Sequence, residues 1–193
     1  MKKILFVNAC VRLQSRTLRL ARRLLEGLEG EITELNLERE GLLPLTRETL
    51  ARREALLAEG RLEDPMLRYA RQFAEADEIV LAAPYWDLSF PAAVKTWLEH
   101  ICVVGVSFRY DENDRPVGLC RAKRLIYVMT AGGPVFPPNH GYAYVRDLCA
   151  TFYGIPRVEL VCAEGLDLAG ADPEAILRDA EASIRNLKLE QKE

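Results

Sequence analysis

A cysteine, two arginines and two hydroxyl side chains lie within eight residues near the start of the chain. Five residues separate Cys10 from Arg16 and Thr17, and Arg12 and Ser15 lie between them. An apolar run precedes these residues and an amphipathic pattern follows, so the segment leads from a strand into a helix. The free N–H groups and dipole of a helix start, with hydroxyl and guanidinium groups beside them, favour an anion. The segment is a candidate phosphate-binding loop, unless Ser15 or Thr17 merely caps the helix.

A covalent mechanism uses the same residues differently. Cys10 and Arg16 match the C-x5-R-[ST] pattern of cysteine phosphatases, in which a thiolate attacks a phosphoryl group held by the arginine. Such a loop wraps tightly around its substrate and favours glycine, whereas residues 11–15 contain none. We therefore expect Cys10 to be a small apolar residue at a strand end, and the phosphatase stays an alternative.

The remaining elements decide what can lie near this loop. Apolar runs predict strands at residues 3–8, 31–37, 79–83, 125–130 and 158–162. Amphipathic patterns predict helices at residues 17–28, 47–59, 65–76, 91–103, 141–153 and 173–187. Residues 107–117 are polar and turn-rich, and residues 38–62 are an ordinary solvated segment by default, with a dimer arm or a lid as alternatives. Strands that alternate with helices predict an α/β fold, a flavodoxin-like doubly wound five-stranded parallel sheet of order 2-1-3-4-5 with helices on both faces. The 193 residues are expected to form one domain, 1–193.

Ligands of such sheets bind beyond the carboxyl ends of the strands, where the strand order reverses. That rule selects the loops at residues 8–17, 84–91 and 130–138. The second loop contains Pro84, Tyr85, Trp86, Asp87 and Leu88, whose adjacent aromatic rings suit a flat ligand. The third contains Thr130, Gly132 and Gly133, whose backbone a ligand can approach closely. A single aromatic residue or a lone Gly-Gly pair is more often structural, but the fold brings all three loops together, which favours a ligand.

Composition excludes several classes of protein. Hydrophobic residues make up 49% of the chain and charged residues 28%, as in a globular protein in water. The net charge of −3 argues against nucleic acid as a partner and is small for an electron carrier that docks on basic proteins. Five widely spaced cysteines suggest reduced thiols, and neither a signal sequence nor an apolar run of membrane-spanning length is visible. We expect a cytoplasmic protein with no membrane partner and no metal.

The chain resembles the flavodoxin-like NAD(P)H-dependent oxidoreductases, the group of FMN-dependent azoreductases and quinone reductases. The resemblance covers nearly the whole chain. Besides the first loop, it rests on residues 83–101 ("APYWDLSFPAAVKTWLEHI"), 105–119 ("GVSFRYDENDRPVGL") and 130–133 ("TAGG"). Two departures concern the substrate: residues 134–138 replace the histidine or tyrosine often found after the paired glycines, and Asp87 replaces a common amide.

The resemblance implies FMN as cofactor, with all chemistry on the flavin and no catalytic side chain. Its phosphate would bind Ser15, Arg16 and Thr17, with Arg12 nearby. Its ribityl chain and ring would contact Pro84, Tyr85, Trp86, Asp87 and Leu88, and its pyrimidine end Thr130, Gly132 and Gly133. NADH or NADPH would reduce the flavin, which would then reduce a quinone or azo compound by ping-pong two-electron transfer. The resemblance also implies a homodimer, with Trp97, Phe108 and Tyr110 near the interface unless Trp97 belongs to the core. A flavin-binding electron carrier without NAD(P)H activity is a further alternative.

Overall fold

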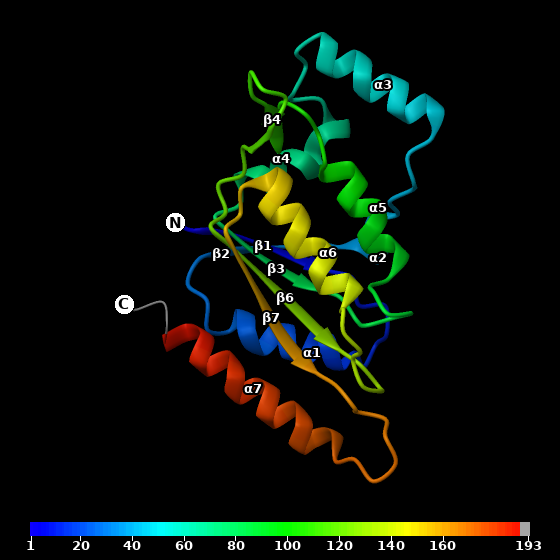
Figure 1. Cartoon of the computed structure of the whole chain (residues 1–193), viewed down its shortest axis with the longest axis vertical. Coiled ribbons are helices and arrows are strands. Elements are labelled where there is room, and N and C mark those ends of the chain that lie inside the picture. The colour runs from blue at the N-terminus through cyan, green and yellow to red at the C-terminus, as the bar shows by residue number, and fades with distance from the viewer. Residues whose placement is uncertain (190–193) are drawn as a thin grey trace.

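A five-stranded parallel sheet forms the centre of the molecule in the computed structural model, which describes residues 1–189 (Figure 1). The predicted domain 1–193 therefore includes four residues that lie outside the described part. The strands are β1 (Lys3–Asn8), β2 (Glu31–Asn36), β3 (Glu78–Ala82), β6 (Arg124–Thr130) and β7 (Arg157–Ala163). Their order is β2-β1-β3-β6-β7, and every neighbouring pair is parallel. The predicted order 2-1-3-4-5 is confirmed, because β4 and β5 form a separate ribbon.

Helices cover both faces of the sheet, as predicted (Figure 1). Helices α1 (Arg16–Leu25) and α7 (Pro173–Leu189) pack on one face, and α4 (Arg68–Glu75), α5 (Ala92–Ile101) and α6 (His140–Leu148) pack on the other. The central strand β3 is buried along its whole length, which explains its uncharged run Ile79–Ala82. Trp97 is 1% exposed and packs edge-on against Phe73, so it belongs to the core, as the alternative prediction had it.

Several short elements were not predicted. The turn-rich segment predicted at residues 107–117 forms two strands, β4 (Phe108–Tyr110) and β5 (Pro116–Gly118), which pair as an antiparallel ribbon and extend to residue 118. The second strand ends at Asn36 rather than at residue 37, because the Asn36 side chain caps a short helix, α2 (Leu37–Glu40). The helix predicted at 65–76 begins with a 3₁₀ turn, η1 (Pro65–Leu67), and the helix predicted at 141–153 ends in a π-helical turn, η2 (Cys149–Tyr153).

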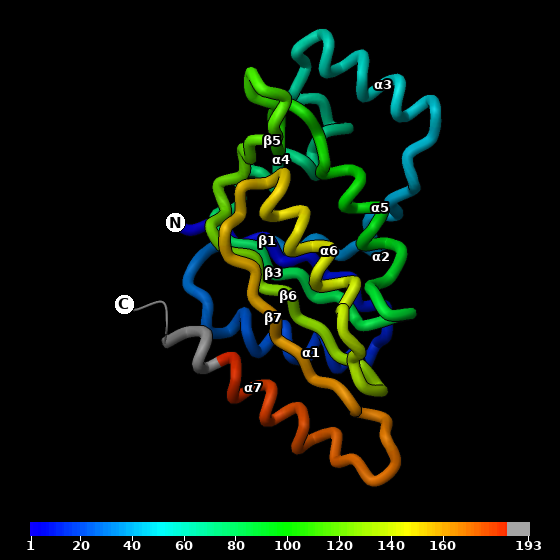
Figure 2. Tube along the Cα trace, in the orientation of Figure 1, coloured from blue at the N-terminus to red at the C-terminus, as the bar shows by residue number. Residues whose placement is uncertain are grey.

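Helix α3 (Arg47–Ala58) lies at one end of the molecule, away from the sheet (Figure 2). Leu56 is its only buried residue, and Arg53 donates to the carbonyl of Glu99 at the end of α5. This placement agrees with the default prediction of a solvated helix. In the described residues, no helix is both long and apolar enough to cross a bilayer.

A buried ion network fastens the amino ends of three strands, at the edge of the sheet opposite the predicted site. Glu78, Arg124 and Glu159 begin or follow the start of β3, β6 and β7 and are each at most 9% exposed. Arg124 pairs with both Glu78 and Glu159, while Lys2 and Arg157 add a second cation to each carboxylate. Each buried charge thus has a partner, which burial in a low-dielectric interior requires.

Candidate functional site

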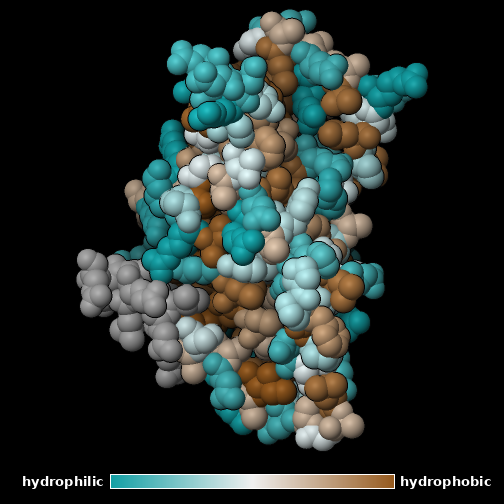
Figure 3. All heavy atoms as spheres, viewed as in Figure 1, coloured by the Kyte–Doolittle hydropathy of each residue, from teal (hydrophilic) through white to brown (hydrophobic). Residues whose placement is uncertain are grey.

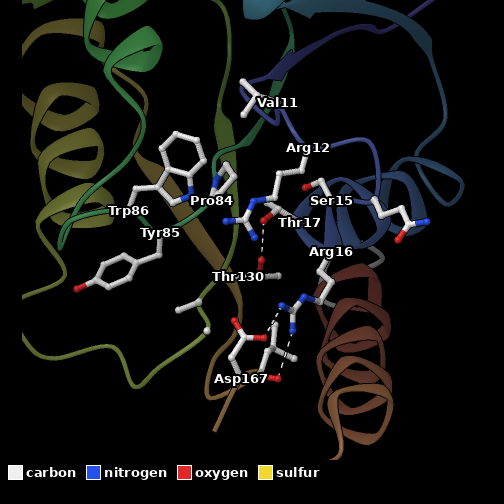
Figure 4. A pocket seen from close by; sticks show the side chains of 14 residues that line it. Val11, Arg12, Ser15, Arg16, Thr17, Pro84, Tyr85, Trp86, Thr130 and Asp167 are labelled. Atoms are coloured by element: carbon white, nitrogen blue, oxygen red, sulfur yellow. Dashed lines mark hydrogen bonds and ion pairs between the residues drawn. The ribbon is translucent and has the colours of Figure 1, made fainter.

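A cavity of about 200 Å³ opens at the carboxyl ends of β1, β3 and β6, where the three predicted loops meet (Figure 4). A fourth loop, which follows β7, closes one side. The cavity is lined by Val11, Arg12, Gln14, Ser15, Arg16, Thr17, Pro84, Tyr85, Trp86, Thr130, Ala131, Gly132, Leu166 and Asp167. The sheet order thus brings together residues that are more than 150 positions apart in the chain.

The start of α1 lines the end of the cavity whose groups suit an anion. Ser15 is the N-cap, and its hydroxyl accepts a hydrogen bond from the backbone N–H of Leu18. That bond leaves the Ser15 hydroxyl proton available to a ligand, so capping and ligand binding do not exclude each other. Arg12 is exposed and extends into the cavity toward Thr17 and Pro84 (Figure 4). No acidic residue lies in the first turn of α1 to oppose an anion.

Arg16 points the other way, toward the loop after β7 (Figure 4). Its Nη2 lies 2.6 Å from Oδ1 of Asp167, and its Nη1 donates to the carbonyl of Leu166 at 3.3 Å. The guanidinium therefore links α1 to the fourth loop.

Thr130 joins two sides of the cavity. Its hydroxyl lies 2.7 Å from the hydroxyl of Thr17, and its carbonyl accepts from the backbone N–H of Tyr85 at 3.0 Å. The first loop and the second loop are both fastened to the end of β6 through this one residue.

Of the two paired glycines, only Gly132 has a close neighbour. A Cβ at position 132 would lie 2.3 Å from Oδ2 of Asp167, so a larger residue would turn the Asp167 side chain aside. Asp167 also donates its backbone N–H to the carbonyl of Gly132 at 2.8 Å. Gly133 has open space around it and an ordinary φ, and it lies outside the lining of the cavity.

The second loop turns sharply just after the cavity. Trp86 and Ser89 exchange both backbone hydrogen bonds, and the two residues between them, Asp87 and Leu88, have φ values of 50° and 66°. Left-handed backbone at two consecutive non-glycine residues is rare and costs about 1–2 kcal/mol per residue. Such strain is typical of binding loops. The Tyr85 hydroxyl is buried without a hydrogen-bond partner in the described residues, which is also unusual.

Nine of the twelve residues predicted for the site line the cavity, and Asp87, Leu88 and Gly133 do not. Whether the nine bind a ligand stays a prediction. Sequence reasoning missed five lining residues: Val11, Gln14, Ala131, Leu166 and Asp167. The last two belong to the loop after the fifth strand. The predicted strand order places that strand beside the fourth, which is the signal that could have pointed to this loop.

Cys10 is poorly placed for nucleophilic catalysis. It is 6% exposed, and its thiol faces the carbonyl of Ala82 at 3.8 Å. Burial raises the pKa of the Cys10 thiol to about 11, so it stays protonated at neutral pH. A phosphatase nucleophile needs the opposite, a thiolate with a lowered pKa. The structure therefore disfavours the phosphatase alternative.

Comparison with known proteins identifies the family. The model of a family described as "Flavodoxin-like fold" matches residues 2–187. The chain is 37% identical over 191 residues to "FMN-dependent NADH:quinone oxidoreductase 2" of Clostridium acetobutylicum, and the match covers 93% of this chain and 94% of that protein. It is 34% identical to "FMN-dependent NADH:quinone oxidoreductase" of Coprothermobacter proteolyticus, with the same coverage of both chains. An FMN-dependent NADH-azoreductase from Bacillus anthracis, solved in complex with FMN, superimposes with a TM-score of 0.81 at 19% identity, covering 97% of each chain.

The chain belongs to the family of proteins with a flavodoxin-like fold. Within that family it belongs to the group of FMN-dependent azoreductases and quinone reductases that its sequence resembles, which confirms the predicted resemblance.

The cavity fits one end of FMN. A helix start with free N–H groups, the Ser15 and Thr17 hydroxyls and the Arg12 guanidinium suit a phosphate. The cavity is smaller than the roughly 300–1,000 Å³ of pockets that enclose a drug-sized ligand. An isoalloxazine ring would therefore lie at the mouth, beside Trp86, which is 36% exposed.

Proposed function

We propose that this protein is an FMN-dependent NADH:quinone oxidoreductase that acts as a homodimer in the cytoplasm. One observation carries the proposal: a phosphate-binding helix start and an aromatic loop meet at the switch point of a flavodoxin-like sheet. The names of the relatives that match over 93% of the chain support it. The five free cysteines, all within the described residues, fit a reducing compartment.

Bound FMN would supply the redox chemistry, which is hydride transfer from the nicotinamide and two-electron reduction of a quinone or azo compound. The protein's part is to hold and orient. Ser15, Thr17 and the start of α1 would hold the phosphate, and the loop that carries Tyr85 and Trp86 would support the ring. Because the Thr17 and Tyr85 segments are both fastened to Thr130, the two ends of the flavin are held in a fixed relation.

The first experiment is a visible absorption spectrum of the protein, saturated with FMN and then desalted. We expect a retained flavin spectrum that bleaches under anaerobic NADH and returns on addition of a quinone. The same titration with NADPH compares the two donors, and the relatives' names lead us to expect NADH to react faster. A retained flavin that neither nucleotide bleaches would instead support an electron carrier. Loss of the flavin on desalting would contradict the proposal.

The phosphatase alternative has its own test. In Cys10→Ala we expect FMN binding and quinone reduction within about twofold of the unchanged protein, because a buried neutral thiol offers the ligand little. A phosphatase assay with p-nitrophenyl phosphate should show no Cys10-dependent activity. Loss of all activity in this variant, without loss of fold, would favour the cysteine mechanism.

The homodimer is supported by apolar side chains exposed beside the cavity. Trp86, Leu88, Phe136 and Tyr144 are 36–62% exposed, on the loops after β3 and β6 and on α6. Figure 3 shows apolar residues scattered among polar ones on the viewed face. Large apolar side chains at the mouth of a binding site suit a second subunit that covers the flavin ring.

Light scattering after size-exclusion chromatography tests the homodimer. We expect twice the 21.8 kDa of one chain. Tyr144→Glu should shift the protein toward the monomer, because a buried unpaired carboxylate opposes association. Leu50→Glu on α3 is the matched control and should leave the mass unchanged. If the unmutated protein is a monomer at micromolar concentration and is fully active, this part of the proposal is contradicted.

A further inference from the structure

The two arginines at the cavity have different surroundings. The Arg16 guanidinium is committed to the loop after β7, with Asp167 at 2.6 Å and the carbonyl of Leu166 at 3.3 Å. Arg12 also lines the cavity. Unlike Arg16, it makes no hydrogen bond or ion pair within the described part of the chain. In Figure 4 its guanidinium extends into the cavity, whereas that of Arg16 turns away toward Asp167. Only one of the two cations is therefore available to a ligand.

Asp167 places a negative charge at a cavity that is built for an anion. Its backbone N–H is bonded to the carbonyl of Gly132, and the neighbouring Leu166 N–H is bonded to the carbonyl of Ala131 at 3.2 Å. Its Oδ2 fills the space that a side chain at position 132 would occupy. The carboxylate is exposed and lies at the cavity wall, held by Arg16, where its charge would repel a phosphate dianion.

We propose that Arg16 is a positioning residue, the counter-ion that neutralises Asp167 and ties the loop after β7 to α1, and that Arg12 is the arginine that binds the flavin phosphate. This assignment rests on the proposed FMN site and divides its two arginines between two roles. It revises the prediction that Arg16 contacts the phosphate. An arginine that left Asp167 to reach the phosphate would expose a carboxylate to a like charge, whereas Arg12 gives up no partner.

Flavin fluorescence titrations with FMN and with riboflavin test the assignment, because riboflavin differs from FMN only in lacking the phosphate. In Arg12→Gln we expect FMN to bind about 10-fold or more weakly, the loss typical of one charge-assisted hydrogen bond. The Kd of riboflavin should stay within about twofold, since it makes no use of that bond. Arg19→Gln is the matched control: Arg19 lies on the same helix, pairs with Glu174 and does not line the cavity. Its FMN affinity should not change.

A double variant separates the two possible roles of Arg16. In Arg16→Gln the unpaired Asp167 should weaken FMN binding about 5- to 10-fold, more at low salt than at high salt, because Asp167 is partly exposed and screened. Adding Asp167→Asn should restore FMN affinity to within about threefold of the unchanged protein, since the like charge is gone. If Arg16 were itself a phosphate ligand, the double variant would bind FMN as weakly as Arg16→Gln does.

Each result of these titrations either supports or overturns the assignment of the two arginines. Rescue by Asp167→Asn with constant riboflavin affinity supports the assignment, and absence of rescue overturns it. A riboflavin affinity that falls as far as the FMN affinity in Arg16→Gln would also overturn it, by showing that repulsion of the phosphate is not the cause of the loss. If the unchanged protein binds neither flavin, the proposed function itself fails. Failure of the proposed function is thus distinguishable from failure of the arginine assignment, because it is seen in the unchanged protein before any variant is measured.

Discussion

At the scale of single residues, the turn at Asp87 and Leu88 combines strain with exposure. Leu88 is 53% exposed, so its side chain gains little from packing to offset a φ of 66°. The rest of the loop holds it there, through the two backbone hydrogen bonds between Trp86 and Ser89. The position is expected to serve the ligand or the partner subunit rather than stability.

Leu88→Gly is therefore expected to raise the free energy of unfolding by up to about 1 kcal/mol, since relief of about 1–2 kcal/mol of strain outweighs the added entropy of the unfolded chain. Urea denaturation monitored by tryptophan fluorescence measures it. Leu43→Gly, at an exposed leucine with an ordinary φ, is the control and should lower stability by about 0.5–1 kcal/mol. Equal losses in both variants would show that the turn at Leu88 is unstrained.

At the scale of elements, long buried strands were easy to predict and short ones were not. The run Ile79–Ala82 has no polar side chain, and both faces of β3 are covered, so composition alone indicates it. Strands β4 and β5 have three residues each, too few for an alternating pattern to stand out from turn residues. The role of Asp167 was hidden for another reason: nothing in "EGLDLAG" indicates that its carboxylate reaches Arg16, 151 positions earlier.

The ion network at the amino ends of the strands predicts a large effect far from the cavity. In Glu78→Gln, buried Arg124 loses a charged partner, and we expect the free energy of unfolding to fall by about 3 kcal/mol. Urea denaturation at constant ionic strength measures this change in the free energy of unfolding. Urea is used instead of guanidinium chloride, because that salt would screen the charge pair. The control is Glu75→Gln, whose half-exposed carboxylate lies 3.8 Å from Lys3 and should change stability by less than about 0.5 kcal/mol. A comparably small effect at Glu78 would mean that Glu159 alone satisfies Arg124.

At the scale of the whole molecule, buried and half-buried thiols on both faces of the sheet are expected to make stability sensitive to alkali. Burial raises the pKa of Cys10 and Cys162 to about 11 and of Cys120 and Cys149 to about 12. Below the ordinary thiol pKa of 9.0, both the folded and the unfolded chain keep these protons. Between pH 9 and 11 the unfolded chain loses them while the folded chain retains them, so stability falls as pH rises.

Each such thiol is expected to lower the free energy of unfolding by up to about 1.4 kcal/mol per pH unit in that range. Urea denaturation from pH 8 to pH 10.5 in the presence of a phosphine reductant measures the slope. Cys149→Ala should reduce the slope of the free energy of unfolding against pH by the amount that corresponds to one proton. The variant also lowers stability at neutral pH, because it opens a small cavity. A stability that stays constant above pH 9 would contradict the burial of these thiols.

Thr130 links two loops of the site through two different groups of one residue. Its hydroxyl contacts Thr17, in the segment proposed to bind the flavin phosphate, and its carbonyl accepts from Tyr85, in the segment proposed to support the flavin ring. In the proposed site, a flavin whose phosphate is bound would therefore find the ring-supporting loop already aligned. We expect phosphate binding and the orientation of the reactive face of the flavin to be coupled through Thr130.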